Sequence, residues 1–501
     1  MAGAPENRDA HLSGLREKAL RGGVFKSLAQ VVTFVTRIGS TAILARLLDP
    51  KDFGLVAMAT AVTGILLLFK DAGLSLATVQ RRDITHEQLS TLFWLNIVLG
   101  LGLALLCVAA APAVAHFYDD SRVFWVTVWT APGFLLGALG MQHNALLMRQ
   151  MRFSVLSAID VASVISGAAV GVAMAFLGCG YWSLVGVSLA MQAAVPIGAW
   201  ACAGWVPGKP HRDREILSMI RLGGAVTLNN IVVYVAYNVD KILLGRYWGA
   251  ETLGSYGRAY QLVNIPTDNI NSAVSSVALS TLSRLQGEPE MLRAYFLKGY
   301  SIVIALTIPA TVACAVFAEE IVGVLLGPKW GASAEIVRLL APTIAVFALA
   351  NPMFWLLFST GLMGRSVKLA VVIAVLVITG YVLGLPYGAR GVASAYSIAM
   401  TLWLVPHIFW CVHGTPVRFS DVTRAMSRPL LAGLLTAAVC IGLKMSGVLP
   451  AQPLLRLLVG GVVLVGVYLL ILLYVMRQRD FYAGLLKAVF VKPAPAGSGV
   501  A

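Results

Sequence analysis

Long apolar runs follow one another along almost the whole of this 501-residue chain and limit what it can fold into. About fourteen of them reach the length, about 20 residues, that a helix needs to cross a bilayer. The links between them are too short for a sizeable soluble domain. With 58% apolar and 12% charged residues, the composition is also far from that of an ordinary soluble chain. We therefore predict an all-α integral membrane protein.

The predicted spans form two runs of six and a final pair. They cover 24–47, 53–78, 90–114, 124–147, 153–177 and 180–203, then 218–244, 253–279, 299–326, 333–360, 366–386 and 390–412, and last 430–448 and 454–476. The chain then divides into an N-terminal arm (1–22), a lobe of helices 1–6 (23–205), a link (206–217), a lobe of helices 7–12 (218–413), helices 13–14 (414–478) and a tail (479–501).

A short internal repeat supports the two lobes. Arg46 and Gly54 follow the first predicted helix, and Arg246 and Gly254 stand 200 positions later in the same place of the second run. Because each run has an even number of helices, both enter the membrane from the same side. We expect parallel lobes, related by an axis along the membrane normal, around a central cavity.

Charge indicates orientation and excludes several classes of function. Lys and Arg are about twice as frequent on one side of the predicted topology, so the positive-inside rule places both termini and the link in the cytoplasm. The net charge of +15 is mainly this signal, and no basic, aromatic-rich soluble segment indicates a nucleic-acid partner. The six cysteines lack metal-binding spacing and no phosphate-binding loop is present, so we expect no cofactor and no metal.

Basic residues deep in apolar spans are the strongest functional signal. An ionisable group at mid-membrane is costly and generally faces a partner or a wet cavity. Arg37, Lys70 and Arg258 lie on the first, second and eighth predicted helices. Together they predict a cationic cavity suited to a phosphate or pyrophosphate group. The alternative for each is a buried ion pair or a side chain that snorkels to the interface.

Other polar residues accompany these bases. Two helical stripes are predicted, one on the seventh span (Asn230, Tyr234, Tyr237, Lys241) and one on the eighth (Arg258, Gln261, Asn264 or Ile265, Asp268). Four acids could bind a proton or Na⁺, or could pair with the bases: Asp71, Asp160, Asp240 and Asp268. These two uses of the acids stay open.

Several motifs resemble one family of membrane proteins. They occur in the order Asp71-Ala72-Gly73-Leu74, Val79-Gln80-Arg81, Thr91-Leu92-Phe93-Trp94-Leu95-Asn96, Asp240-Lys241 with Leu244-Gly245-Arg246, Leu282-Ser283-Arg284-Leu285-Gln286, Leu326-Gly327-Pro328-Lys329-Trp330 and Gly388-Ala389-Arg390-Gly391-Val392-Ala393. This series resembles the Wzx-like polysaccharide flippases of the multidrug/oligosaccharidyl-lipid/polysaccharide exporter superfamily. The resemblance runs from about residue 20 to residue 415. One departure is Ser280, in a neighbourhood where the family often has a proline.

The resemblance implies a transporter, not an enzyme, in the bacterial inner membrane. It would move undecaprenyl-pyrophosphate-linked oligosaccharide from the cytoplasmic to the periplasmic leaflet by alternating access, for export of a surface polysaccharide. Arg37, Lys70 and Arg258 would hold the pyrophosphate. The sugar would contact Tyr234, Tyr237, Gln261 and Asn264. A polysaccharide polymerase and co-polymerase are further partners that such a role suggests.

Three rival interpretations stay open at this point. A multidrug/cation antiporter of the same superfamily would need an acidic cavity, whereas the deep bases here at least match the deep acids. A membrane-embedded polymerase generally needs a large outer loop, and the outer links here are short. A scaffold would be an unusual place for deep charges, because these are costly in a membrane.

Overall fold

A computed structural model describes residues 6–70, 74–81, 84–211, 234 and 237–490. Its described residues form helices and contain no β-strand. They fold as two compact units, unit 1 (Met1–Gly257) and unit 2 (Arg258–Ala501). The boundary between the units lies inside one long helix, α10 (Val239–Arg284). Much of the predicted link 206–217 lies outside the described residues, so the predicted division into lobes stays a prediction.

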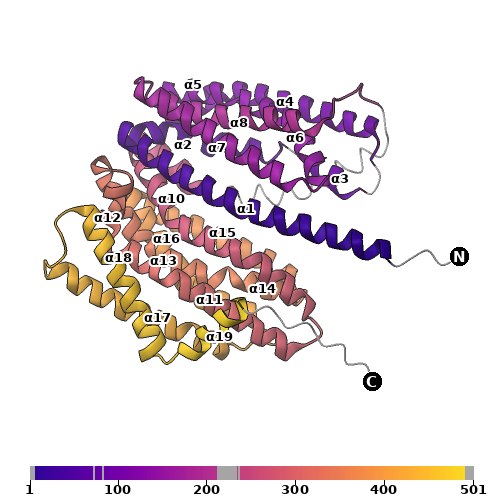
Figure 1. Ribbon diagram of the computed structural model, residues 1–501. Helices are drawn as coiled ribbons and strands as arrows, with labels where there is room; N and C mark the ends of the chain where they lie inside the picture. The colour runs from indigo at the N-terminus through magenta and orange to yellow at the C-terminus, as the bar shows by residue number, and fades with distance from the viewer. Residues whose placement is uncertain (1–5, 71–73, 82–83, 212–233, 235–236, 491–501) are drawn as a thin grey trace. The chain divides into compact units, whose positions relative to one another are not determined.

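Unit 1 is a bundle of long helices and two short ones (Figure 1). Its helices before α10 are α1 (Glu6–Leu47), α2 (Pro50–Leu67), α3 (Leu74–Gln80), α4 (His86–Tyr118), α5 (Ser121–Thr130), α6 (Pro132–Arg149), α7 (Phe153–Phe176) and α8 (Trp182–Ala203). Helix α8 packs against both α6 and α7, while α1 packs against α7 and α4 packs against α6.

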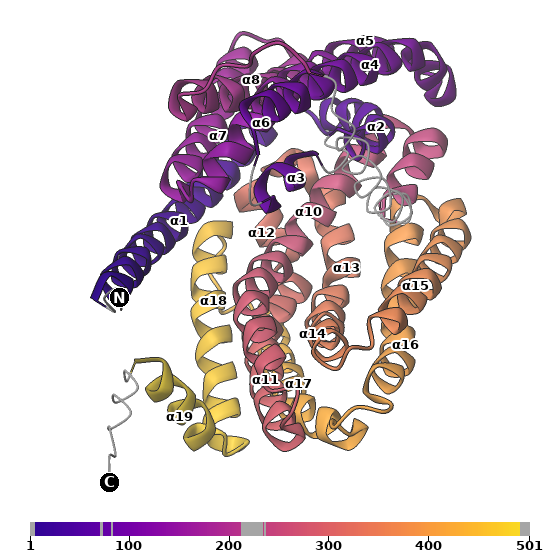
Figure 2. The ribbon, with the colours of Figure 1, turned by 90° about the vertical axis from the view of Figure 1, so that its right-hand side faces the viewer.

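Unit 2 contains the rest of α10 and the helices that follow it (Figure 2). These are α11 (Pro289–Val316), α12 (Ala318–Leu325), α13 (Gly331–Ala350), α14 (Pro352–Ser359), α15 (Met363–Gly384), α16 (Gly388–Val412), α17 (Phe419–Met445), α18 (Pro453–Leu470) and α19 (Arg479–Phe490), with short helical turns η1 (Pro328–Trp330), η2 (Leu385–Tyr387) and η3 (Ile471–Val475). Helix α11 packs against α13 and α17, and α16 packs against α13 and α15.

The ends of these helices follow from local sequence. Thr85 caps α4, because its hydroxyl accepts from Gln88 N while Thr85 N donates to the Gln88 side chain. Pro50 begins α2 and Pro132 begins α6, at positions where the missing N–H costs nothing. Gly204 ends α8 with a φ of 62°, a conformation that glycine adopts without strain.

The described residues contain 11 helical segments that are long and apolar enough to cross a membrane. Segment Met363–Val412 has 50 residues and covers two of the predicted spans, α15 and α16. Most of the predicted seventh span lies outside the described residues. The prediction of an all-α integral membrane protein is confirmed, whereas the count of fourteen stays a prediction.

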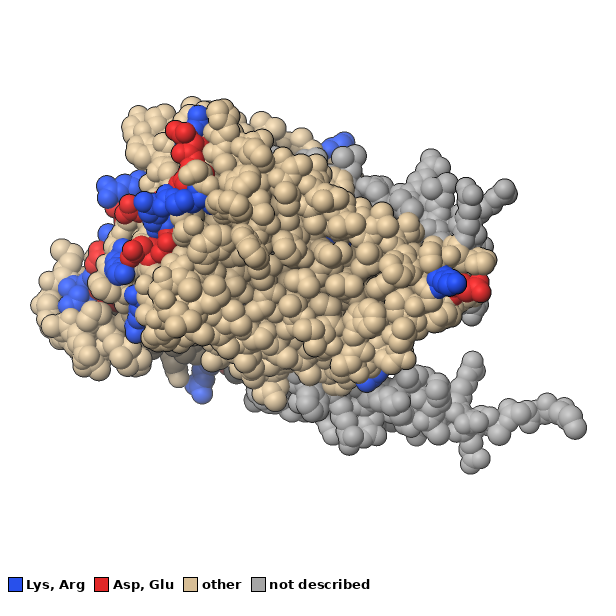
Figure 3. All heavy atoms as spheres, turned by 90° about the horizontal axis from the view of Figure 1, so that it is seen from above, with Lys and Arg blue, Asp and Glu red and all other residues tan. Residues whose placement is uncertain are grey.

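The outer surfaces of these segments suit lipid. Only 22% of the most apolar stretch of Pro453–Val475 is buried within the protein, which would leave a soluble chain with a large exposed apolar surface. On the face drawn in Figure 3, charged side chains gather toward the margins and leave a broad uncharged surface between them. The chain is therefore a multi-pass membrane protein.

A second internal repeat is visible in the helix pairs α7–α8 and α15–α16. Arg152, at the start of α7, donates to Cys202 O at the end of α8, at 2.6 Å. Arg365, at the start of α15, donates to Trp410 O at the end of α16, at 3.0 Å. In both pairs an arginine satisfies carbonyl groups that the partner helix leaves unpaired at its C-terminus. The two helix pairs thus share a local device at corresponding ends.

The glycines of the first repeat make a reciprocal contact within unit 1. The backbone of α10 at Ala250 O fills the place where a Gly54 Cβ would stand, and the backbone at Pro50 O fills the place of a Gly254 Cβ. The contacted residues, Pro50 and Ala250, are 200 positions apart in the sequence, as the two glycines are. The two segments thus approach each other through a local two-fold relation, and only glycine permits so close an approach.

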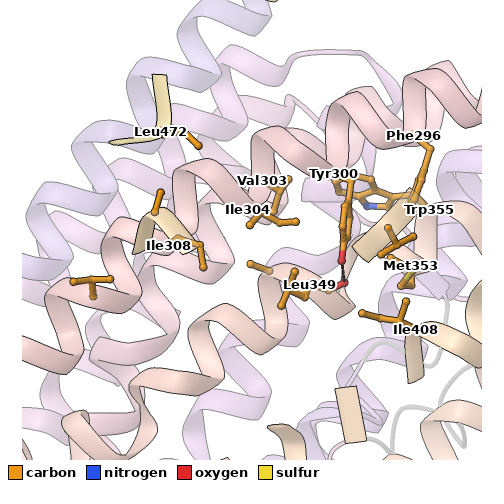
Figure 4. Packing of buried hydrophobic residues seen from close by; sticks show 14 of the residues in the cluster. Phe296, Tyr300, Val303, Ile304, Ile308, Leu349, Met353, Trp355, Ile408 and Leu472 are labelled. Atoms are coloured by element: carbon orange, nitrogen blue, oxygen red, sulfur yellow. Dashed lines mark hydrogen bonds between the residues drawn. The ribbon is translucent and has the colours of Figure 1, made fainter. Parts of the chain in front are cut away.

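The core of unit 2 lies where α11 meets α13, α14 and α16 (Figure 4). Tyr300 stacks on Phe296, and its buried hydroxyl donates to Leu349 O at 3.2 Å. Trp355 is 1% exposed and donates its indole N–H to Ser275 Oγ. The cluster extends to residues of α17 and α18, so the final helix pair shares this core.

Candidate functional site

Lys70 lies at a break in the second predicted span. That span, 53–78, is not one helix: α2 ends at Leu67 and α3 begins at Leu74. The backbone N–H groups of Leu68 and Lys70 bond to carbonyls three residues back, at 3.2 Å each, which closes α2 in a tight final turn. Broken helices within a membrane are found where the backbone is buried in protein or lines a cavity. Asp71 lies outside the described residues.

The Lys70 side chain turns onto α6. Its Nζ and Cε atoms occupy the space where a Cβ of Gly137 would stand. The side chain is half-buried, and its ammonium group lies midway along the span Ser121–Arg149. A cationic group at this depth is energetically expensive, which is why Lys70 is kept as a candidate site residue.

Arg37 lies on an exposed face of α1. Its charge, like that of Lys26, attracts the carboxylate of Asp160 on α7, the helix against which α1 packs. Asp160 is itself exposed. The predicted cation and the predicted acid therefore lie close enough in unit 1 for their charges to act on each other.

Tyr234 lies against α2. Its hydroxyl is 3.2 Å from both Thr60 O and Ala61 O, to which it donates, and it fills the space beside Gly64. Tyr237 is 37% exposed. Tyr234 thus contributes to the seam between its own segment and α2, while Tyr237 presents more of its ring to its surroundings.

Asp240 is fully buried and has two partners in unit 1. Its Oδ2 accepts from the Tyr256 hydroxyl at 2.8 Å, and its Oδ1 accepts from Lys241 N at 2.8 Å. The Lys241 ammonium donates to Asn238 Oδ1 at 2.8 Å. The Asp240–Tyr256 bond joins the two arms of α10 on either side of its non-helical residue, Gly249. Asp240 therefore has a structural role here, beside any role in ion coupling.

The polar stripe on the eighth span lies on the second arm of α10, in unit 2. Arg258 is half-buried and donates to Gln261 Oε1 at 2.6 Å. Asn264 is half-buried and Asp268 is exposed. The helix continues through Pro266, so the spacing predicted from the sequence is kept along one face.

The structure thus places the candidate residues in two groups. Unit 1 holds Arg37, Lys70, Asp160, Tyr234, Tyr237 and Asp240, and unit 2 holds Arg258, Gln261, Asn264 and Asp268. Among the residues that the structure describes, no group of three or more His, Cys, Asp or Glu side chains could hold a metal ion.

Gln192 is a polar residue of unit 1 that the sequence reasoning missed. It lies on α8 and its amide covers Gly133 of α6, with Oε1 2.5 Å from the place of a Gly133 Cβ. A search for amides near the middle of predicted spans would have found it, because Gln192 stands ten residues after the start of α8 at Trp182.

Taken together, the described residues have the fold of a helical, multi-pass membrane protein, with a break in the second predicted span and polar side chains at mid-depth. Among solved structures, it is similar to the lipid II flippase MurJ in an inward closed conformation, with a TM-score of 0.74, 13% identity, and coverage of 92% of this chain and 100% of that one. It is also similar to an inward-facing multidrug MATE transporter, with a TM-score of 0.60, 14% identity, and coverage of 79% and 96%.

The chain belongs to the polysaccharide biosynthesis protein family, whose profile matches residues 43–335, more than half of its length. It is 24% identical to the lipopolysaccharide biosynthesis protein WzxC of Escherichia coli, over 77% of this chain and 80% of that protein. It is 27% identical to the teichuronic acid biosynthesis protein TuaB of Bacillus subtilis, over 68% and 71%. The family resemblance predicted from the motifs is confirmed.

Proposed function

We propose that this protein is a flippase that moves undecaprenyl-pyrophosphate-linked oligosaccharide units from the cytoplasmic to the periplasmic leaflet for export of a surface polysaccharide. The observation that carries the proposal is Lys70, a mid-membrane cation held at a helix break against Gly137 of α6. A lipid-linked pyrophosphate is an anion that reaches this depth only if the protein supplies compensating charge.

The names of relatives support a polysaccharide cargo. Besides the two proteins above, a relative in Rhizobium meliloti is named a succinoglycan biosynthesis transport protein, with 27% identity over 63% of this chain and 64% of that protein. These names concern three different polymers. A carrier for units of a polymer is the role that fits all three.

Each candidate residue has a proposed role in this cycle. Arg37, Lys70 and Arg258 hold the pyrophosphate, and Tyr234, Tyr237, Gln261 and Asn264 contact the sugars. Asp71, Asp160, Asp240 and Asp268 are the candidates for coupling to a proton or Na⁺. Two parallel six-helix lobes open alternately to either side while the lipid tail stays in the bilayer. The protein resides in the bacterial inner membrane with both termini in the cytoplasm, and a polymerase with its co-polymerase receives the cargo.

Alanine substitutions test the role of the bases. We expect Arg37→Ala and Arg258→Ala each to lower export at least tenfold, because loss of a charge-assisted hydrogen bond to phosphate costs about 1.5–3 kcal/mol. Arg424→Ala, which removes an exposed arginine of α17 outside the site, is the matched control. Membrane levels of each variant are measured alongside export. Undiminished export by both cavity variants at normal membrane levels would contradict the cationic site.

A multidrug/cation antiporter is the second candidate, because the fold is shared with a multidrug transporter. Its cargo would be cationic and would be repelled by Lys70 and Arg258. Drug susceptibility of cells that lack the protein discriminates the two functions: the flippase proposal predicts no change, and a selective sensitivity to cationic drugs would favour the antiporter.

A further inference from the structure

Polar side chains from other elements lie over two glycines of α6. Gly133 lies under the amide of Gln192, from α8, and Gly137 lies under the ammonium of Lys70, from the break after α2. In each case the polar head occupies the space that a Cβ would need. Residues four apart lie on the same face of a helix, with their Cβ positions about 6 Å apart. The two heads are therefore neighbours along one face of α6, one helical turn from each other.

Gln192 is held in this position from its own helix. Its Nε2 donates to Ser188 Oγ at 3.1 Å and to Ser188 O at 3.3 Å, one turn earlier in α8. Its amide lies against Gly133 of α6, with Oε1 and Nε2 2.5 and 2.6 Å from the place of a Cβ. The amide is half-buried and stands near the middle of the span Trp182–Ala203. The bonds to Ser188 use the amide nitrogen, so the amide oxygen can still accept a hydrogen bond from a hydroxyl group of a ligand.

We infer that Gln192 is a specificity-determining residue of the cargo site, which binds a hydroxyl group of the sugar next to the pyrophosphate while Lys70 binds the pyrophosphate. The inference rests on the proposed function. An amide both donates to and accepts from hydroxyl groups, whereas an ammonium group suits a phosphate oxygen. The C3 and C4 hydroxyls of a glycosyl phosphate lie about one sugar ring from the phosphate, a separation similar to one turn of α6.

The Gln192 position and the Lys70 position can be disrupted by separate substitutions in α6. A methyl group at Gly133 would displace the Gln192 amide, whereas a methyl group at Gly137 would displace the Lys70 ammonium. Each side chain can therefore be moved without being replaced. Gly133→Ala should imitate loss of Gln192, and Gly137→Ala should imitate loss of Lys70.

The test compares two ligands on the purified full-length protein: undecaprenyl pyrophosphate, and the lipid-linked oligosaccharide that accumulates in cells depleted of the protein. The wild type should bind the glycosylated lipid more tightly. Gln192→Leu should weaken binding of the glycosylated lipid about five- to tenfold, as expected for one hydrogen bond to a neutral group, and leave binding of undecaprenyl pyrophosphate unchanged. Gln452→Leu, which removes an exposed amide just before α18, is the matched control and should change neither affinity.

The remaining variants separate the inference from the proposed function. Gly137→Ala should weaken both ligands by a similar factor, and Gln192→Asn, which withdraws the amide by one methylene, should give an intermediate loss for the glycosylated lipid alone. An unchanged affinity of Gln192→Leu for the glycosylated lipid, or an equal loss for both ligands, would overturn the sugar contact while the flippase proposal stands. Failure of the wild type to bind either lipid would contradict the proposed function itself.

Discussion

Some charged residues are candidates for cargo binding, whereas others form ion pairs that hold helices together. Glu320, which begins α12 beside Glu319, is 3% exposed and lies 3.0 Å from the Lys444 ammonium and 3.4 Å from the Arg456 guanidinium. These partners belong to α17 and α18. Two adjacent glutamates at the end of a predicted apolar span suggest exposure to water, and the structure shows this for Glu319 but not for Glu320. The spacing of residues could not reveal the two basic partners, because they are contributed by helices more than 100 positions away.

We predict that Glu320→Gln destabilises unit 2. Removing one member of a buried ion pair leaves its partners uncompensated, at a cost of about 3 kcal/mol. Glu319→Gln is the matched control, because Glu319 is 60% exposed and water weakens its contacts with Arg338, at 2.8 Å, and Lys444, at 3.6 Å, so its loss should cost less than about 1 kcal/mol. Thermal unfolding in detergent measures both. Equal effects of the two substitutions would contradict the role of Glu320.

A second residue-scale prediction concerns pH. Asp120 caps α5 and binds Arg122 through both carboxylate oxygens, at 3.0 and 2.6 Å. This bond, with the attraction of Lys51, holds the pKa of Asp120 below its ordinary value, against the opposing effect of burial. A lowered pKa in the folded state gives stability that is present above the ordinary aspartate pKa of about 3.9 and is lost as pH falls through the folded value.

Asp120→Asn isolates this charge, because asparagine is also a good helix cap. We expect the wild type to exceed the variant in stability by at most about 1 kcal/mol at neutral pH, since the pair is partly exposed. The difference should vanish as pH falls below about 3.9. Unfolding temperatures recorded as a function of pH provide the measurement, and a difference that does not change with pH would contradict the assignment.

At the scale of elements, close helix approaches depend on glycine. The reciprocal contacts of Gly54 with Ala250 and of Gly254 with Pro50 bring α2 against α10 through their backbones. A Cβ at either glycine would meet backbone atoms, which cannot rotate away as a side chain can. The glycines that repeat in the sequence therefore also lie at the contact between α2 and α10.

We predict that Gly54→Ala and Gly254→Ala destabilise unit 1 by similar amounts, each about 1–3 kcal/mol or more, because both overpack the same crossing. Gly102→Ala is the matched control, since nothing lies within 4 Å of a Cβ at this position of α4. It should be neutral or stabilising, because alanine is the better helix former. Thermal unfolding of the three variants checks this. A neutral result at both Gly54 and Gly254 would show that the helices separate at no cost.

Hydropathy was sufficient to predict most of the helices but not where they break. The second predicted span runs through Lys70 and Asp71 as one helix, yet in the structure α2 and α3 are separate helices and Lys70 stands at the break. Apolar windows report length and composition, whereas a break depends on tertiary partners such as Gly137, which receives the Lys70 head. The depth of Arg37, Lys70 and Arg258 was readable in the sequence. The depth of Gln192 was readable as well, but its position near Lys70 was not, because only the fold brings α8 to the same face of α6.

At the scale of the whole molecule, the chain belongs to the polysaccharide biosynthesis protein family and its fold is similar to that of the lipid II flippase MurJ. A transport experiment can determine the direction in which the protein moves lipid and the identity of the cargo. A flippase acts before polymerisation and presents its cargo on the far leaflet, so its loss must trap the lipid-linked unit on the side where it is made. A polymerase acts after that step, and its loss traps the unit on the other side.

The most direct measurement is to deplete the protein in its own cell and to locate lipid-linked oligosaccharide with a membrane-impermeant sugar-modifying enzyme. We predict that the oligosaccharide accumulates and stays inaccessible in intact spheroplasts, becoming accessible only when the membrane is opened. Accumulation of unpolymerised units that the enzyme reaches from outside, or no accumulation at all, would contradict the flippase account.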